Sequence, residues 1–302
     1  MPVGNFKHDV SLTSLNTARN PWHLGGLTWV ELGQRVWHEI EKDELLGRAA
    51  QLAYYFLLAL FPALLFLTAL MGLFPINAST SEFMRFIQAM LPGDAFSLIQ
   101  KYLDHVVQGS GGDLISLGIL GALWASSSAV TAITEALNVA YGAQETRPFW
   151  KVRLMGIALT IGLAGFIILS TALALYGGSI IELTAELFSL GWAFALTWKL
   201  LQWPLIILLM LFAIAVIYYT CPNIEQHWRW ITPGSVFAVI SWVVVSLGFK
   251  FYVRNFWNYN VAYGSIGGVI VLLFWLYLSG LVILIGGELN AEIEGAAGKR
   301  TA

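Results

Sequence analysis

Six stretches of this chain, each 19 to 25 residues long, contain no charged side chain. They cover residues 50–74, 114–134, 154–176, 200–221, 231–249 and 264–287, and every Asp, Glu, Lys and Arg lies outside them. A bilayer core about 30 Å thick is crossed by about 20 apolar helical residues. The stretches lack the two-residue alternation of an outer-membrane barrel. The sequence therefore predicts an all-α, polytopic membrane protein with about six transmembrane helices.

Composition supports this class and excludes others. Charged residues make up 11% of the chain, whereas soluble domains average about 25%. The formal net charge of −2 provides no basic surface for nucleic acid. The expected partners are therefore membrane lipids, and no nucleic acid.

The distribution of Lys and Arg sets the expected orientation, because cytoplasmic loops carry an excess of both. With the N-terminus inside, 11 of the 16 Lys and Arg residues fall in cytoplasmic segments, including a loop at 135–153. We therefore expect a multi-pass protein of a bacterial inner (plasma) membrane, with both termini in the cytoplasm.

Two further segments are predicted to be helical. Residues 27–46 carry apolar side chains at helical spacing together with Trp29 and Trp37, which is typical of an interfacial helix; an amphipathic helix packed on the bundle is the alternative. Residues 81–108 are broken at Pro92 and are expected to form a helical hairpin on the outer face. We treat 1–302 as one transmembrane domain with flexible tails at 1–25 and 295–302.

Polar side chains cluster near three helix ends that the topology places at one depth. They are Arg48 and Gln51 at the start of the first predicted helix, Glu135 and Asn138 after the second window, and Glu288 and Asn290 after the last. A buried carboxylate there needs a cation or hydrogen-bond donors, and Arg48 is the candidate partner. This inner-mouth cluster is interpreted as a polar gate or proton-responsive site, or alternatively as a structural ion pair at the interface.

A second polar group lies near the outer end of the fifth window. Lys250 and Arg254 are four residues apart and so share a helix face, and Asn258 continues it. Such a group can attract an anionic substrate or lipid headgroup at an outer mouth. The alternative is that the two cations snorkel to the outer interface.

Helix-breaking and small residues add two structural expectations. Pro62 and Pro204 interrupt the first and fourth windows and should kink those helices. Gly118, Ala122 and Ser126 form a small-residue face on the second helix that favours close helix packing. This face also leaves a homo-oligomer open.

Catalytic and metal-binding patterns are missing from the sequence. The five histidines show neither HxxxH nor HxH spacing, and GxSxG, Walker and GxGxxG patterns do not occur. We therefore expect no enzyme activity, no cofactor, no metal and no catalytic residues.

Several blocks, taken in their order and spacing, resemble the YihY/BrkB family of inner-membrane proteins over nearly all of residues 26–294. The blocks are Arg48-Ala49-Ala50-Gln51-Leu52-Ala53-Tyr54-Tyr55, Leu123-Trp124-Ala125-Ser126, Glu135-Ala136-Leu137-Asn138, Thr232-Pro233-Gly234-Ser235, Tyr263-Gly264-Ser265-Ile266-Gly267-Gly268 and Gly287-Glu288-Leu289-Asn290-Ala291. The resemblance implies a six-helix inner-membrane bundle and a commonly supposed transport role, with members linked to serum resistance and lipid export. It supplies no catalytic residues. An older ribonuclease label is read as a misassignment, because this sequence lacks an HxHxDH metal cluster.

Three functions follow from these observations. The first is an inner-membrane transporter or lipid translocase for an anionic lipid or solute. Kinked helices and polar residues at both mouths favour this function. The second is a non-transporting membrane scaffold or regulator. The third and remotest is a membrane-bound hydrolase or nuclease.

Overall fold

The computed structural model describes residues 21–72, 112–187, 192–226, 228, 230–256 and 260–298, and all elements in this part of the chain are helices. They are η1 (Pro21–Gly26), α2 (Trp29–Lys42), α3 (Leu45–Gly72), α6 (Gly112–Ala140), α7 (Phe149–Leu187), α8 (Trp192–Thr220), α9 (Pro233–Phe256) and α10 (Asn260–Ala296). Four candidate membrane spans lie at Phe149–Leu173, Leu200–Thr220, Pro233–Tyr252 and Gly268–Ala296. The other two predicted windows correspond to α3 and α6. The prediction of an all-α polytopic membrane protein is confirmed, and the predicted hairpin at 81–108 lies outside the described residues.

The core of the bundle lies at the end where α3 begins and where α6, α8 and α10 end; we call this the polar end. Helix α3 packs between α6 and α10, and α9 packs against α10. The fully buried side chains here include Leu52 of α3, Leu137 of α6 and Leu284 of α10. Farther along the spans, large apolar side chains such as Leu200 and Leu247 are exposed, as expected for surfaces that face lipid.

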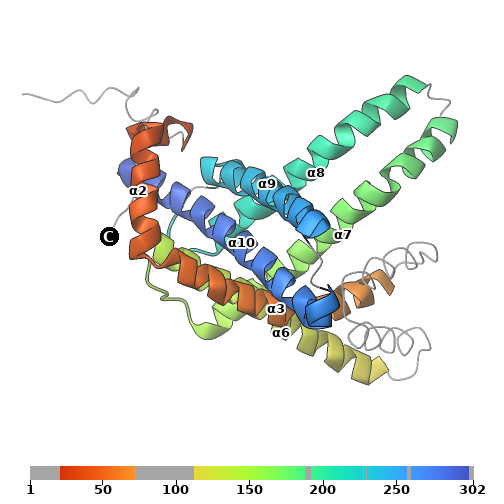
Figure 1. Cartoon of the computed structure of the whole chain (residues 1–302), viewed down its shortest axis with the longest axis horizontal. Coiled ribbons are helices and arrows are strands. Elements are labelled where there is room, and N and C mark those ends of the chain that lie inside the picture. The colour runs from red at the N-terminus through yellow and green to blue at the C-terminus, as the bar shows by residue number, and fades with distance from the viewer. Residues whose placement is uncertain are drawn as a thin grey trace, which may run out of the picture.

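Helices α7 and α8 form a long hairpin that leaves the bundle at the polar end. Figure 1 shows their far ends standing away from α3, α9 and α10. Helix α7 contacts α6 near its start, and α8 contacts α9. The hairpin is therefore anchored mainly at the polar end.

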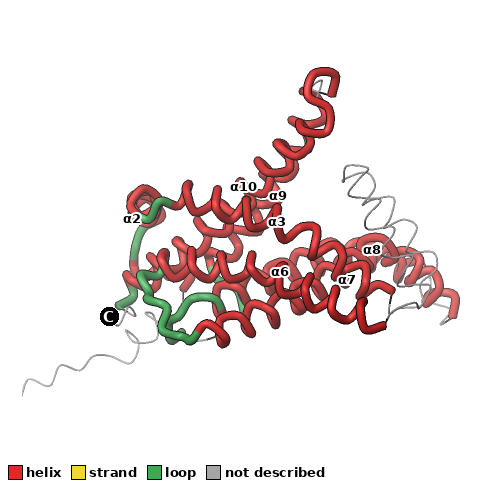
Figure 2. Tube along the Cα trace, turned by 90° about the horizontal axis from the view of Figure 1, so that it is seen from below, coloured by secondary structure: helices red, strands yellow, loops and turns green. Residues whose placement is uncertain are grey.

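Helix α2 lies across the polar end, nearly end-on in Figure 2 and upright in Figure 1. Thr28 begins it with a capping box, in which the Thr28 side chain accepts from the Glu31 amide and the Glu31 carboxylate accepts from the Thr28 amide. Leu32 and Val36 are buried against Leu24 and against Ile293 of α10.

Trp29 (67%) and Trp37 (66%) of α2 are nonetheless exposed. The helix therefore packs on the bundle, which was the alternative interpretation, and it also keeps two exposed Trp side chains of the kind that an interfacial helix carries. Its placement on a membrane surface stays a prediction. Since η1 and α2 contact the last turns of α10, the first and last described helices lie at the same end of the bundle.

Candidate functional site

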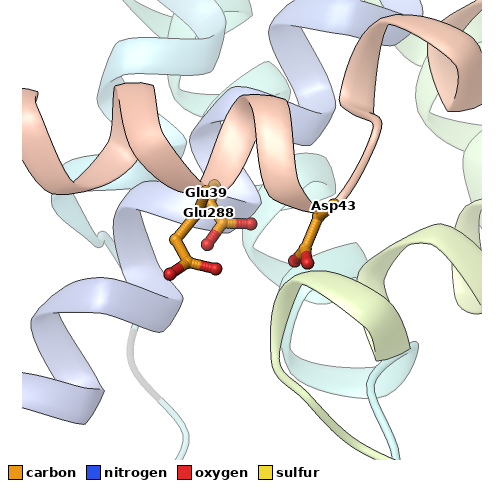
Figure 3. A group of neighbouring side chains, drawn as sticks. All are labelled: Glu39, Asp43 and Glu288. Carbon is orange, nitrogen blue, oxygen red and sulfur yellow. The ribbon is translucent and has the colours of Figure 1, made fainter.

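Glu288 of α10 is the most buried charged side chain of the polar end, with 0% of its surface exposed. Glu39 and Asp43 approach it from the end of α2, so that one carboxylate oxygen from each of the three residues lies within 4.8 Å of the others (Figure 3). Lys42 provides a cation beside them, with its Nζ 2.6 Å from Glu39 Oε2. Three crowded carboxylates can share a proton or supply oxygen ligands to a hard cation.

Glu288 belongs to the predicted inner-mouth cluster, whereas Glu39 and Asp43 were not predicted from the sequence to be site residues. A signal existed, because the two residues are four apart and so share one face of α2. The positive φ of 52° at Glu44 ends α2 and turns the chain into α3, which brings that face over α10. Local periodicity alone does not reveal this turn.

Tyr141, directly after α6, is a second group that the sequence analysis missed. The side chain is 5% exposed, and burial raises the pKa of its hydroxyl well above the ordinary value, with the nearby Glu294, Tyr218 and Glu288 adding to the rise. A hydrogen bond to the Asn290 side chain acts in the opposite direction. Tyr141 therefore stays protonated and can donate its proton in a hydrogen bond at the polar end.

Asn290 holds the start of α9 against α10. The Gly234 amide donates to Asn290 Oδ1 at 3.0 Å, and Asn290 Nδ2 donates to Thr232 Oγ1 at 3.0 Å. The backbones approach closely here, since a Cβ added at Gly234 would meet the carbonyl oxygen of Gly286. Asn290 thus acts as a structural bridge between two helices.

Asn138 is buried in a second polar network, which we call the loop latch: Asn138, Glu145, Arg147 and Asn223. Asn138 donates from Nδ2 to Glu145 Oε2 at 2.9 Å and accepts from the Asn223 amide at 2.7 Å. Arg147 pairs with Glu145 at 2.7 Å and donates to the carbonyl of Cys221 at the end of α8, also at 2.7 Å. The hydrogen bonds from Arg147 lower the pKa of Glu145 to about 2. The latch therefore joins the ends of α6 and α8.

Three residues of the predicted inner-mouth cluster do not join these networks. Arg48 donates its Nε to the backbone oxygen of Asp43 at 2.8 Å, and not to either of the carboxylates it was expected to pair with. Gln51 and Glu135 are exposed. The cluster is thus divided into a buried carboxylate, two structural amides and three peripheral side chains. Whether it acts as a gate stays a prediction.

The structure assigns Arg153 to a different place from the one expected. Helix α6 extends to Ala140 and α7 begins at Phe149, so the connecting loop is shorter than 135–153. Arg153 therefore lies in a candidate span, is 8% exposed, and packs against α6. The counts of Lys and Arg that set the expected orientation treat every Lys and Arg as a loop residue, so they could not identify Arg153 as part of a span.

The outer-mouth group is described only in part. Lys250 is an exposed residue of α9, Arg254 lies in the last turns of α9 without a described side chain, and Asn258 is outside the described residues. Pro204 lies inside α8 and Pro62 falls in the range of α3. Both kinks remain predictions.

An apolar groove of about 230 Å³ lies between α3, α6 and α7. Apart from the hydroxyls of Ser126 and Thr160, its lining is hydrocarbon, namely Phe56, Ala59, Leu60, Ala129, Val130, Ile133, Leu163, Ala164 and Ile167. The Thr160 hydroxyl is turned to its own helix and donates to the Gly156 carbonyl. Ile167, at the edge of the groove, is exposed. The groove is therefore suited to a hydrocarbon chain and unsuited to a hydrated ion.

Comparisons with known proteins agree on one family. The model of the family described as virulence factor BrkB matches residues 36–302. The chain is 39% identical to the putative ribonuclease-like protein YfkH of Bacillus subtilis, over 82% of this chain and 90% of that protein. It is 26% identical to a UPF0761 membrane protein of Aeromonas salmonicida over 89% of each chain. No solved structure matches. The chain therefore belongs to the BrkB family of membrane proteins.

Proposed function

We propose that this membrane protein moves an amphipathic lipid, of anionic type, between the leaflets of a bacterial inner membrane. The observation that supports the proposal is the apolar groove between α3, α6 and α7. A groove lined by hydrocarbon within membrane-crossing helices stabilises an acyl chain and offers no ligands to a soluble ion.

Charged groups inside a membrane bundle support the same proposal. They are costly to bury and mark substrate or ion pathways. Glu288 and Arg153 are both buried in helices of the bundle. In the proposed mechanism the groove holds the acyl chain, while the polar end provides the charged and hydrogen-bonding groups that a headgroup requires. The cytoplasmic location of both termini is part of the proposal, and the shared position of η1 and the end of α10 supports it.

The test is leaflet exchange of a fluorescent anionic phospholipid in proteoliposomes. Ala164 lines the groove and is 6% exposed, so Ala164→Phe should fill the groove and reduce exchange. Ala158 is an exposed residue of the same helix, so Ala158→Phe is the matched control and should exchange at the wild-type rate. The paired change Lys250→Ala/Arg254→Ala tests the outer-mouth prediction in the same assay.

Exchange no faster than in empty liposomes, with folded protein confirmed, would refute the proposal. The favoured function would then be a scaffold or regulator that binds partners within the membrane. The words "ribonuclease-like" in the name of the Bacillus relative keep a hydrolase as the remotest alternative, which a cleavage assay with metal titration addresses.

A further inference from the structure

Arg153 is a buried cation with neutral neighbours. It lies in the candidate span Phe149–Leu173 and is 8% exposed. The ion pairs at the polar end join Arg35 to Glu292, Lys42 to Glu39 and Arg147 to Glu145. Arg153 is in none of these pairs, so within the described residues no carboxylate neutralises it.

The groups that Arg153 contacts are all weak substitutes for an anion. Its Nη1 donates to Ser128 Oγ at 3.2 Å, its Nη2 donates to the Trp124 carbonyl, and the guanidinium carbon lies 4.1 Å from the centre of the Trp124 ring. The Trp124 carbonyl also accepts from the Ser127 hydroxyl at 2.7 Å, so this acceptor is shared.

Much of the hydrogen-bonding capacity of Arg153 is unused. A guanidinium has five N–H donors in a planar fork. The buried Nε of Arg153 has no acceptor, and each Nη uses one donor on a neutral oxygen. A charged group this deeply buried is expected to be paired. The missing partner is therefore an anion with at least two oxygens that can lie in the plane of the fork.

The surroundings indicate where that anion comes from. Phe149 and Trp150, at the start of α7, are 72% and 63% exposed, and exposed aromatic rings of this kind mark a membrane interface. Arg153 lies one turn farther along α7. Trp124, whose ring covers the guanidinium, is itself 51% exposed, and Leu154 is 57% exposed. The site thus faces the lipid side of the bundle, one turn from the exposed aromatic residues at the start of α7.

We propose that Arg153 binds the phosphate of an anionic phospholipid at the seam between α6 and α7, with the Trp124 ring as its cover. The phosphate oxygens accept from Nε and Nη of the fork and take the place of neutral acceptors. The inference goes beyond the proposed function, because a tightly held lipid at this seam requires no movement between leaflets.

The test uses the purified full chain in a neutral detergent, with phosphatidylglycerol and phosphatidylcholine of equal chain length as probes. We expect phosphatidylglycerol, and not phosphatidylcholine, to raise the unfolding temperature and to be retained in native mass spectrometry. Because a charge-assisted hydrogen bond contributes about tenfold or more in affinity, Arg153→Gln should weaken phosphatidylglycerol binding by about tenfold. Arg153→Lys, which keeps the charge without the fork, should bind with intermediate affinity. Arg35→Gln, which removes an exposed cation from α2, is the control and should bind normally.

Three results would overturn the proposal. They are equal retention of the two lipids by the wild-type protein, full phosphatidylglycerol binding by Arg153→Gln, and an equal shift with inorganic phosphate alone, which would indicate a soluble anion. The first measurement uses only the wild-type chain, so the proposal stays testable if Arg153→Gln fails to fold. A failure of leaflet exchange with normal phosphatidylglycerol binding would reject the proposed function and leave this site in place.

Discussion

The close contact between α9 and α10 makes Gly234→Ala a sharp test of the structure. A Cβ at Gly234 would overlap the carbonyl oxygen of Gly286 and would lie 2.6 Å from Asn290 Oδ1. Overpacking of this kind costs about 1–3 kcal/mol. Displacing Asn290 also removes the hydrogen bond from the Gly234 amide, which contributes about 1 kcal/mol.

The expected loss is therefore about 2–4 kcal/mol of unfolding free energy, or roughly 4–16 °C in unfolding temperature. The assay is thermal unfolding of the detergent-solubilised protein. Gly248→Ala is the matched control, because Gly248 lies on the same helix with nothing within 4 Å of its added Cβ. Alanine is the better helix former by about 1 kcal/mol, so the control should be unchanged or slightly more stable. Equal unfolding temperatures for the two variants would refute the described packing of α9 on α10.

Three further outcomes are expected. Hydrogen bonds from Arg147 lower the pKa of Glu145 to about 2, so ionised Glu145 adds stability that is complete above its ordinary pKa of 4.5 and is lost as the pH falls toward 2. Glu145→Gln should therefore flatten an acid-unfolding curve over this pH range, and the control Glu135→Gln should not. Cys221, the only cysteine, is buried, and burial raises the pKa of its thiol to about 11. Because the thiolate is the nucleophile, maleimide labelling at pH 8 should be slow until the protein is unfolded, and fast labelling of the folded chain would contradict the burial of Cys221. Glu288→Ala should lower the free energy of unfolding by about 1–3 kcal/mol because the side chain is fully enclosed, whereas Glu135→Ala, at an exposed position, should change it by less than about 0.5 kcal/mol. Equal unfolding temperatures for the two variants would contradict the difference in burial between the two carboxylates.

The helices could be predicted from the sequence because their cause is local. A charge-free stretch long enough to cross a bilayer has few alternatives to a helix, and each of the six windows corresponds to one. Helix ends were harder to place, since a charged residue near a window does not by itself mark a loop. This is why Arg153 was counted with the loop at 135–153, although the structure places it on α7. Glu182 and Glu186, which lie beyond the charge-free window 154–176, are likewise on α7.

For the candidate site, the sequence predicted only which polar residues lie at a similar depth in the membrane. The sequence placed Glu288, Asn138 and Asn290 at similar levels, and the structure finds all three buried at the polar end. Which of them touch depends on how α2 turns into α3 and on how closely α9 approaches α10, and both are tertiary events. Hence Asn138 and Asn290 look alike in the sequence but have different roles. Asn138 joins the end of α6 to the segment after α8, and Asn290 joins α10 to the start of α9.

The attachment of the α7–α8 hairpin has a mechanical consequence. The loop latch and Arg153 fix it near the polar end, and the far ends stand apart from the bundle (Figure 1). Helix α7 lines the groove with α3 and α6 as far as Ile167, and the part from Ile167 to Leu187 is about 30 Å long, so a 10° bend at Ile167 would displace the far end by about 5 Å. The hairpin is therefore held at one end by helix packing and by the loop latch, and a small change of angle there becomes a larger displacement at the far ends.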